Sequence, residues 1–217
     1  MRWAALTWLL VVFLCGCTVV AGDPVWRGAR LEGALPTAAD FPPGVRFDRV
    51  DEGPDQPGGR AGPPAMLSRP EGCADGLTRV IENNAQRGPG SAEKYVVAYD
   101  GARVVMTVLS WNLDMEALAA VADRCAAYEI FFDPAAQGIP VTTTRIEGPR
   151  RGALVYEQAM DLSGMRNNVF FSFENVGDSA AFGIAFPTSD PGIPVKGTLP
   201  QTFLDVATMQ AQRLEPR

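Results

Sequence analysis

The sequence predicts an α+β domain: a twisted, mainly antiparallel sheet with about three helices packed mostly on one face, and one disulfide. Segments of strand composition outnumber helical segments, and most lie in the second half of the chain. A turn signal such as Asp100-Gly101 joins two neighbouring strand segments directly, as antiparallel pairing allows. No regular alternation of strands with helices is present, so a parallel α/β sheet is not expected.

The N-terminus has the pattern of a bacterial export signal. A positive start at Arg2 precedes an apolar run from Ala4 to Leu14, which is too short for a permanent membrane span. The run ends in Leu14-Cys15-Gly16-Cys17, which resembles a lipobox. We therefore expect a signal peptide over 1–16, palmitate-type acylation of Cys17, and a lipid anchor on the extracytoplasmic face of the cell membrane. The alternative is cleavage after Ala21, which would release a secreted protein.

The rest of the chain divides into a tether and one domain. Residues 17–40 show no periodicity and are rich in Gly, Pro, Ala and Asp, which predicts a flexible tether. Residues 41–215 can bury one hydrophobic core. A first strand is expected at 45–50, and the Gly- and Pro-rich stretch 53–70 is expected to cross the surface without regular structure.

Three helices are predicted. The first covers 74–87, the second covers 114–127 with Asp114 as its N-cap, and the third runs from a capping box at Thr198–Gln201 to Leu214. Further strands are expected at 94–100, 102–111, 128–133, 141–147, 153–161, 169–176 and 179–186, with a hairpin turn at Asn175–Asp178.

Two cysteines, Cys73 and Cys125, remain after the leader. Each lies on the apolar stripe of its predicted helix. In an exported domain, two such cysteines most economically form a disulfide, which would join two inward-facing helix surfaces.

Composition excludes several classes of function. The formal net charge is −6, which argues against nucleic acid and against charge-driven binding to anionic lipid. Histidine is absent, and with it the usual general base, the Ser-His pair and most zinc sites. We expect no cofactor, no metal and no enzymatic activity, with hydrolysis as a remote alternative.

Three polar patterns could carry chemistry, and each has a simpler explanation. Ser91-Ala-Glu-Lys94 matches the S-x-x-K motif of penicillin-binding enzymes, but Lys94 begins a predicted strand where that motif needs a helix. Partial matches to the other motifs of those enzymes occur at Ser189-Asp190 and Lys196-Gly-Thr198. They lie within ten residues of each other, and the residue order of the second differs from K-T-G. An acidic cluster could suggest calcium but lacks the spacing of a calcium loop; it consists of Asp48, Asp51, Glu52 and Asp55. Three arginines could bind an anion but fit ordinary surface charge better; they are Arg145, Arg150 and Arg151.

Aromatic residues in the second half exceed the needs of a minimal core. Core packing is the default, and an apolar groove against the sheet is the alternative. The small side chains on one face of the last strand would let a helix or a ligand approach closely. The candidate groove comprises Trp111, Tyr156, Phe171, Phe173, Ala181, Gly183 and Ala185.

A family resemblance extends over roughly 35–214. It is carried by the lipobox, the tether, Phe41-Pro-Pro-Gly44, Gly72-Cys73 opening a helix, the strand into Trp111, and Asp123-Arg-Cys125 ending a helix. Together these features resemble mycobacterial lipoproteins of unknown function, which are similar to the extracellular sensor domain of PknH-type receptor kinases. The resemblance implies a non-enzymatic, sensor-like domain that binds a small apolar or amphipathic ligand, or an envelope partner protein. The alternative is a structural or protein-interaction lipoprotein without a small ligand.

Overall fold

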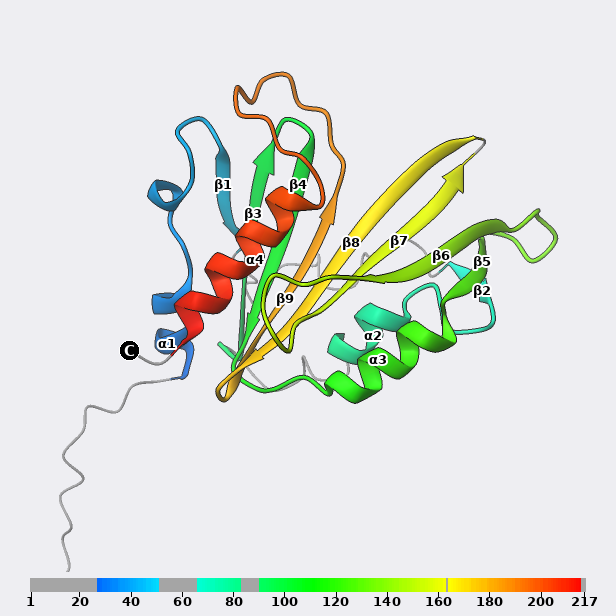
Figure 1. Ribbon diagram of the computed structural model, residues 1–217, viewed down its shortest axis with the longest axis horizontal. Helices are drawn as coiled ribbons and strands as arrows, with labels where there is room; N and C mark the ends of the chain where they lie inside the picture. The colour runs from blue at the N-terminus through cyan, green and yellow to red at the C-terminus, as the bar shows by residue number, and fades with distance from the viewer. Residues whose placement is uncertain (1–26, 51–65, 83–89, 163, 216–217) are drawn as a thin grey trace, which may run out of the picture.

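The computed structural model of the chain describes residues 27–50, 66–82, 90–162 and 164–215 (Figure 1). The predicted signal peptide over 1–16, the lipidation site Cys17, most of the acidic cluster and the end of the first predicted helix lie outside these residues. No helix in the described ranges is long and apolar enough to cross a membrane.

A single antiparallel sheet dominates the structure, which confirms the predicted α+β class. Each strand pairs antiparallel with its neighbours, and the twist of the sheet is visible in Figure 1. In spatial order the nine strands are β1 (Arg46–Val50), β3 (Ala92–Tyr99), β4 (Ala102–Leu109), β9 (Ser179–Phe186), β8 (Met165–Val176), β7 (Leu154–Leu162), β6 (Ile139–Ile146), β5 (Ala127–Phe131) and β2 (Leu67–Arg69). Strand β2 was not predicted, because it is a three-residue edge strand within the segment expected to be irregular.

Both predicted tight turns are confirmed. Tyr99 pairs with Ala102, so Asp100 and Gly101 form a two-residue loop in which Gly101 has a φ of +108°. Val176 pairs with Ser179, and Gly177 has a φ of +62°. Positive φ at these loop positions is the reason that glycine marks the turns in the sequence.

Three of the helices follow the prediction, and each begins one to three residues later than predicted. They are α2 (Gly76–Glu82), α3 (Met115–Arg124) and α4 (Gln201–Leu214). Asp114 caps α3 as predicted, because its Oδ1 accepts a hydrogen bond from the Ala117 N–H at 2.9 Å. The predicted capping box of α4 is wrong. The helix begins only at Gln201, and the Thr198 N–H donates instead to the Thr202 hydroxyl at 2.8 Å.

The predicted tether over 17–40 is wrong for its second half. Residues Arg27–Ala34 form helix α1, and Ala38–Asp40 form a single turn of 3-10 helix, η1. Leu31 and Leu35 are 1% and 3% exposed and belong to the main core. Two glycines within α1 lower its intrinsic helix propensity, so the segment depends on packing against the rest of the domain.

The helices cover opposite faces of the sheet, which corrects the prediction that they pack mostly on one face. In β9, Ala181 and Ala185 belong to the core cluster of α1 and α4, whereas Ala180 and Phe182 belong to the cluster of α2 and α3. Successive strand residues point to opposite faces. The alternation is visible in the sequence, but the face that each helix covers depends on long connections that local patterns do not encode.

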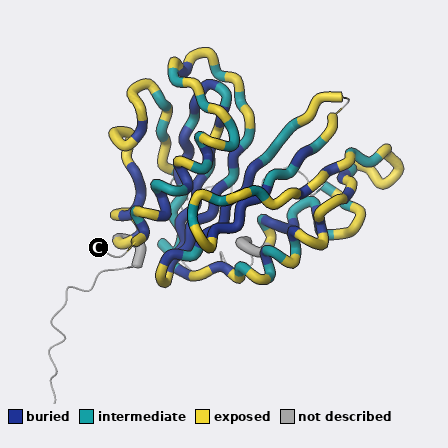
Figure 2. Tube along the Cα trace, viewed as in Figure 1, coloured by how far each residue is buried: buried dark blue, intermediate teal, exposed yellow. Residues whose placement is uncertain are grey.

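The core accordingly lies on both sides of the central strands (Figure 2). One cluster fills the space between the sheet and α1 with α4, and a second lies beneath α2 and α3. A third, smaller cluster surrounds Cys73 and Cys125. Away from the helices, the ends of β7 and β8 and the loop after β5 project and are mostly exposed (Figure 2).

Candidate functional site

The predicted disulfide between Cys73 and Cys125 is present. Their Cα atoms lie 5.5 Å apart and both residues are at most 2% exposed. Cys73 lies just before α2 and Cys125 is the C-cap of α3, so the bridge joins helix ends rather than the middle of two helix stripes. The difference arises because α2 begins at Gly76, two residues later than predicted.

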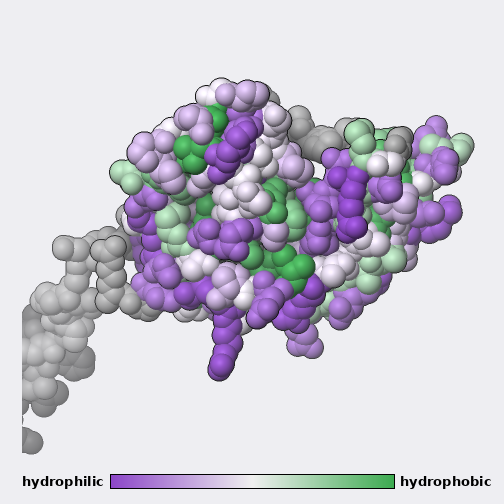
Figure 3. All heavy atoms as spheres, turned by 45° about the horizontal axis from the view of Figure 1, so that its top comes forward, coloured by the Kyte–Doolittle hydropathy of each residue, from purple (hydrophilic) through white to green (hydrophobic). Residues whose placement is uncertain are grey.

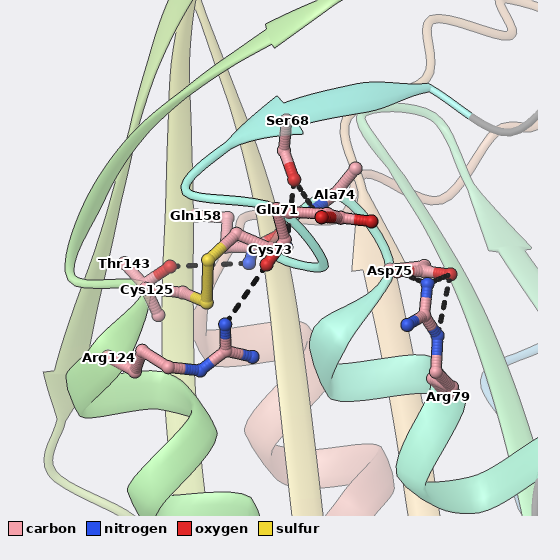
Figure 4. Close-up of a disulfide and its surroundings, with 10 residues drawn as sticks. All are labelled: Ser68, Glu71, Cys73, Ala74, Asp75, Arg79, Arg124, Cys125, Thr143 and Gln158. Atoms are coloured by element: carbon pink, nitrogen blue, oxygen red, sulfur yellow. Dashed lines mark hydrogen bonds and ion pairs between the residues drawn. A yellow bond between two sulfur atoms is a disulfide. The ribbon is translucent and has the colours of Figure 1, made fainter.

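Hydrogen bonds hold the segment around the bridge (Figure 4). The Ser68 hydroxyl of β2 accepts from the N–H groups of Cys73 and Ala74 at 2.8 and 3.1 Å. Arg124 at the end of α3 donates to the Glu71 carbonyl at 3.1 Å. This junction therefore ties an edge strand to both helices, and its role is structural.

The predicted groove residues do not form one groove. Trp111, Tyr156, Phe171 and Phe173 lie together in the cluster beneath α2 and α3, each at most 6% exposed. The Phe173 ring stacks on Phe182 at a centroid distance of 5.2 Å. These aromatic side chains fill their own space, which favours the core-packing alternative.

The small-residue strip of Ala181, Gly183 and Ala185 lies on the opposite face, under α4. A Cβ at Gly183 would stand 2.7 Å from both Met106 Sδ and Phe203 Cε2. The close approach predicted for this strip is therefore taken by helix α4. The sequence pattern identified the small residues of the strip but not the helix that packs against them.

The other candidate residues are also dispersed. Arg150 lies 2.7 Å from both Glu174 and Glu215, and these carboxylates raise its pKa. The Arg150 guanidinium is thus paired with carboxylates of the same domain, while Arg145 and Arg151 are exposed. Ser91 precedes β3 and Lys94 lies within it, so the helical arrangement of the S-x-x-K motif is not formed. The described residues contain no group of acidic or sulfur side chains that could hold a metal ion.

A different part of the molecule has the form of a site. The loop over 187–199, between β9 and α4, is fixed to the β3–β4 turn by backbone hydrogen bonds. The Asp100 N–H donates to the Val195 carbonyl at 2.9 Å, the Gly197 N–H donates to the Asp100 carbonyl at 2.8 Å, and the Gly101 N–H donates to the Thr188 carbonyl at 2.9 Å. A Cβ at Gly101 would stand 2.4 Å from the Gly197 carbonyl oxygen, so the contact requires glycine. The loop is thereby held in one place.

The Asp100 side chain strengthens this attachment. One carboxylate oxygen pairs with Lys196, and the other accepts from the Asp190 N–H at 3.1 Å. The hydrogen bond from Lys196 is the first cause of a lowered pKa at Asp100, followed by the bond from Asp190. The Asp100 side chain is only 11% exposed, whereas that of Lys196 is 81% exposed. Asp100 therefore fixes a lysine whose ammonium still faces solvent.

Two adjoining hollows lie beside this loop, and we call them together the distal depression. They have volumes of about 380 and 610 Å³ and share Gly101, Pro187, Gly197 and Thr198. Arg166, Asn168, Phe170 and Leu199 line the first hollow, and Asn167, Ser189 and Lys196 are among the residues that line the second. Figure 3, which turns this end toward the viewer, shows mainly hydrophilic side chains with small hydrophobic areas between them. Sequence analysis missed this region because its walls come from distant segments.

A second surface feature lies at one end of the sheet. The large hydrophobic side chains that are exposed within the described residues are Leu67, Phe132, Leu162 and Met165. Leu67 pairs with Phe131 across β2 and β5, and Leu162 pairs with Met165 across β7 and β8. Because the pairing of β5, β6 and β7 is continuous, these four residues lie toward the same end of the sheet, and we call them the apolar row.

Comparison with known proteins gives one similar structure. No family model matches the chain, and no curated protein matches it. Among solved structures, the chain is similar to an uncharacterised protein from Mycobacterium smegmatis, described as an Rv0999 ortholog, at 14% identity and a TM-score of 0.47. The match covers 87% of this chain and 94% of that chain. The description of that mycobacterial protein names no activity, and the resemblance to lipoproteins and to the PknH-type sensor domain stays a prediction.

Proposed function

We propose that this chain is a non-enzymatic protein of the cell envelope. A lipid on Cys17 anchors it to the membrane, and its domain binds a ligand as a sensor domain does. The distal depression is the observation that carries the proposal. Its rim is fixed by backbone hydrogen bonds, and its volume falls within the usual range of small-molecule sites. A site that is formed before binding does not spend binding free energy on ordering a loop.

The disulfide supports an extracytoplasmic location. Buried structural disulfides persist in oxidising compartments and are rare in the cytosol. Helix α1 shortens the predicted tether, because Arg27 follows Cys17 by only ten positions. Ten residues reach at most about 35 Å. Figure 1 places α1 and the 187–199 loop at different ends of the molecule. The distal depression lies beside that loop, so an anchor that precedes α1 would leave the depression accessible.

The anchor is tested by expressing the full chain in an actinobacterial host and separating the products between detergent and aqueous phases. We expect wild-type protein in the detergent phase with an acylated N-terminal Cys17, and a Cys17→Ala variant without acylation. A soluble product that begins at Gly22 would favour the secreted alternative. Unprocessed protein in the cytosol with reduced Cys73 and Cys125 would contradict the proposed location.

Ligand binding is tested by native mass spectrometry of the protein purified from that host. We expect an added mass that is lost when Gly101 is replaced by Val, since a side chain there displaces the 187–199 loop. Gly152→Val is the matched control, because Gly152 also has positive φ but has no neighbour within 4 Å of the added Cβ. A bare mass for the wild-type protein would count against a small ligand.

The apolar row favours a second candidate function, in which the domain binds a partner protein. Phe132 and Met165 are 73% and 68% exposed, and aromatic and methionine side chains are enriched at protein–protein interfaces. Cross-linking in the host should capture a partner with wild-type protein and not with a Phe132→Ser, Met165→Ser double variant. If the double variant captures the same partner, the row is not the interface.

A further inference from the structure

The chemistry of the distal depression indicates the class of ligand. We propose that it binds a small molecule with an oxyanion head, a carboxylate or a phosphate, on an apolar body. The inference rests on the proposed binding function and specifies its substrate class. It depends on two features of the depression: a pair of basic side chains, one of them a lysine that Asp100 fixes, and an apolar part of the wall.

The basic side chains distinguish this region within an acidic protein. Arg166 lines one hollow and Lys196 the other, and the two hollows adjoin. The protein as a whole has a net charge of −6. Within the described part of the chain, Asp100 is the only carboxylate on the walls, and both of its oxygens already accept hydrogen bonds. An anion in the depression therefore faces donors and cations rather than unpaired carboxylates.

Both basic groups keep donors for a ligand. The Arg166 Nε donates to the Asn168 Oδ1 at 3.3 Å, which directs the guanidinium while its terminal nitrogens remain for an oxyanion. The Lys196 ammonium has three donors and is held by Asp100 while 81% of its side chain stays exposed. Asn167, Thr188 and Thr198 add neutral donors around the same hollow. These groups suit the several acceptor oxygens of a carboxylate or a phosphate.

Part of the wall is apolar, which favours an amphipathic ligand over a bare ion. Phe170 is 4% exposed and lines the first hollow together with Pro187 and Leu199. In β8, residues 166, 168 and 170 alternate onto the same face as α4, so the arginine and the phenyl ring share one surface. A ligand with its head at Arg166 can place its apolar part over Phe170 and Leu199.

The test uses the chain from Thr18, which we call the mature chain without its anchor, and n-hexyl phosphate as the probe. This chain lacks the predicted lipidation site but retains every described element. Binding is followed by amide shifts at 166–170 and 196–199 in a nuclear magnetic resonance titration. We expect saturable binding that Arg166→Gln weakens by about tenfold or more, the loss expected for a charged hydrogen bond. Lys196→Gln should act similarly, with thermal unfolding measured to confirm the fold. Arg103→Gln is the matched control, since Arg103 is exposed on the opposite face of the sheet.

Three further probes separate the outcomes. Inorganic phosphate should bind far more weakly than hexyl phosphate if the apolar part of the wall contributes. Vesicles containing phosphatidic acid should shift the same amides if the head group can belong to a membrane lipid, whereas an effect of the monomer alone identifies a free metabolite. Equal binding of hexyl glucoside, or no effect of Arg166→Gln, overturns the anion preference and leaves the proposed binding function intact. No shift at these amides with any probe overturns both.

Discussion

Removing the Cys73–Cys125 disulfide should cost about 4 kcal/mol of unfolding free energy. The bridge closes a loop with a sequence separation of 52, and the chain-entropy relation gives about 4 kcal/mol for a loop of that length. In a domain of this size each kcal/mol shifts the melting temperature by about 2 to 4 °C. We therefore expect a fall of about 8 to 16 °C for the Cys73→Ala, Cys125→Ala double variant.

Urea unfolding of the mature chain, followed by fluorescence, measures this loss. Replacing both cysteines avoids a free thiol, and wild-type protein refolded under reductant is the matching control without any substitution. Because both cysteines are at most 2% exposed, reductant added to the native protein should act only as fast as the domain opens. A loss below about 1 kcal/mol would refute the argument, since the bridge would then restrict the unfolded chain far less than the closure of a free loop of this length requires.

Three more results are expected. Leu31→Ala should lower the unfolding free energy by about 2 to 5 kcal/mol, because Leu31 is 1% exposed in the core, and no change in urea unfolding would restore the tether interpretation of this segment. Gly183→Ala should lower the unfolding free energy by about 1 to 3 kcal/mol, because the added Cβ would contact α4. Gly33→Ala is the control and should leave stability equal or slightly higher, because nothing lies within 4 Å of its added Cβ. Equal urea midpoints for both variants would contradict this packing. Burial raises the pKa of all four tyrosine hydroxyls, that of Tyr128 to about 12, while the unfolded chain releases these protons near pH 10. The contribution of the tyrosines to stability is thus full below about pH 10 and falls as the pH rises. Tyrosinate absorbance at about pH 10 should therefore be much weaker in the native than in the guanidinium-unfolded protein, and equal absorbance would show that the rings are accessible.

Features that depend on a few neighbouring residues were predictable from the sequence. The Asp100-Gly101 and Gly177-Asp178 turns were predicted because a two-residue loop needs backbone torsions that glycine adopts. The Asp114 cap was predicted because its carboxylate reaches an N–H only three residues away. The disulfide was predicted because only two cysteines follow the predicted leader and its lipidation site, and two cysteines in an exported domain would be oxidised.

Features that depend on distant packing were not predictable. Helix α1 has two glycines and no strong local signal, and its place in the core comes from contacts with α4, where the Gln210 side chain donates to the Ala34 carbonyl at 3.1 Å. The division of helices between two faces likewise depends on how long connections cross the sheet. The groove prediction failed for the same reason, because the aromatic side chains lie on the face of α2 and α3, while α4 packs on the small-residue strip of the other face.

The sequence by itself therefore determined the antiparallel class, the turns and the disulfide, since each follows from composition or from a few residues, whereas the export signal stays a prediction. Only the tertiary structure decided which faces are covered and where an open site lies. The distal depression joins Asp100, Arg166 and Lys196, which are separated by 66 and 30 positions, and no local pattern specifies that such segments meet. Their meeting results from sheet pairing and from the backbone bonds of the 187–199 loop.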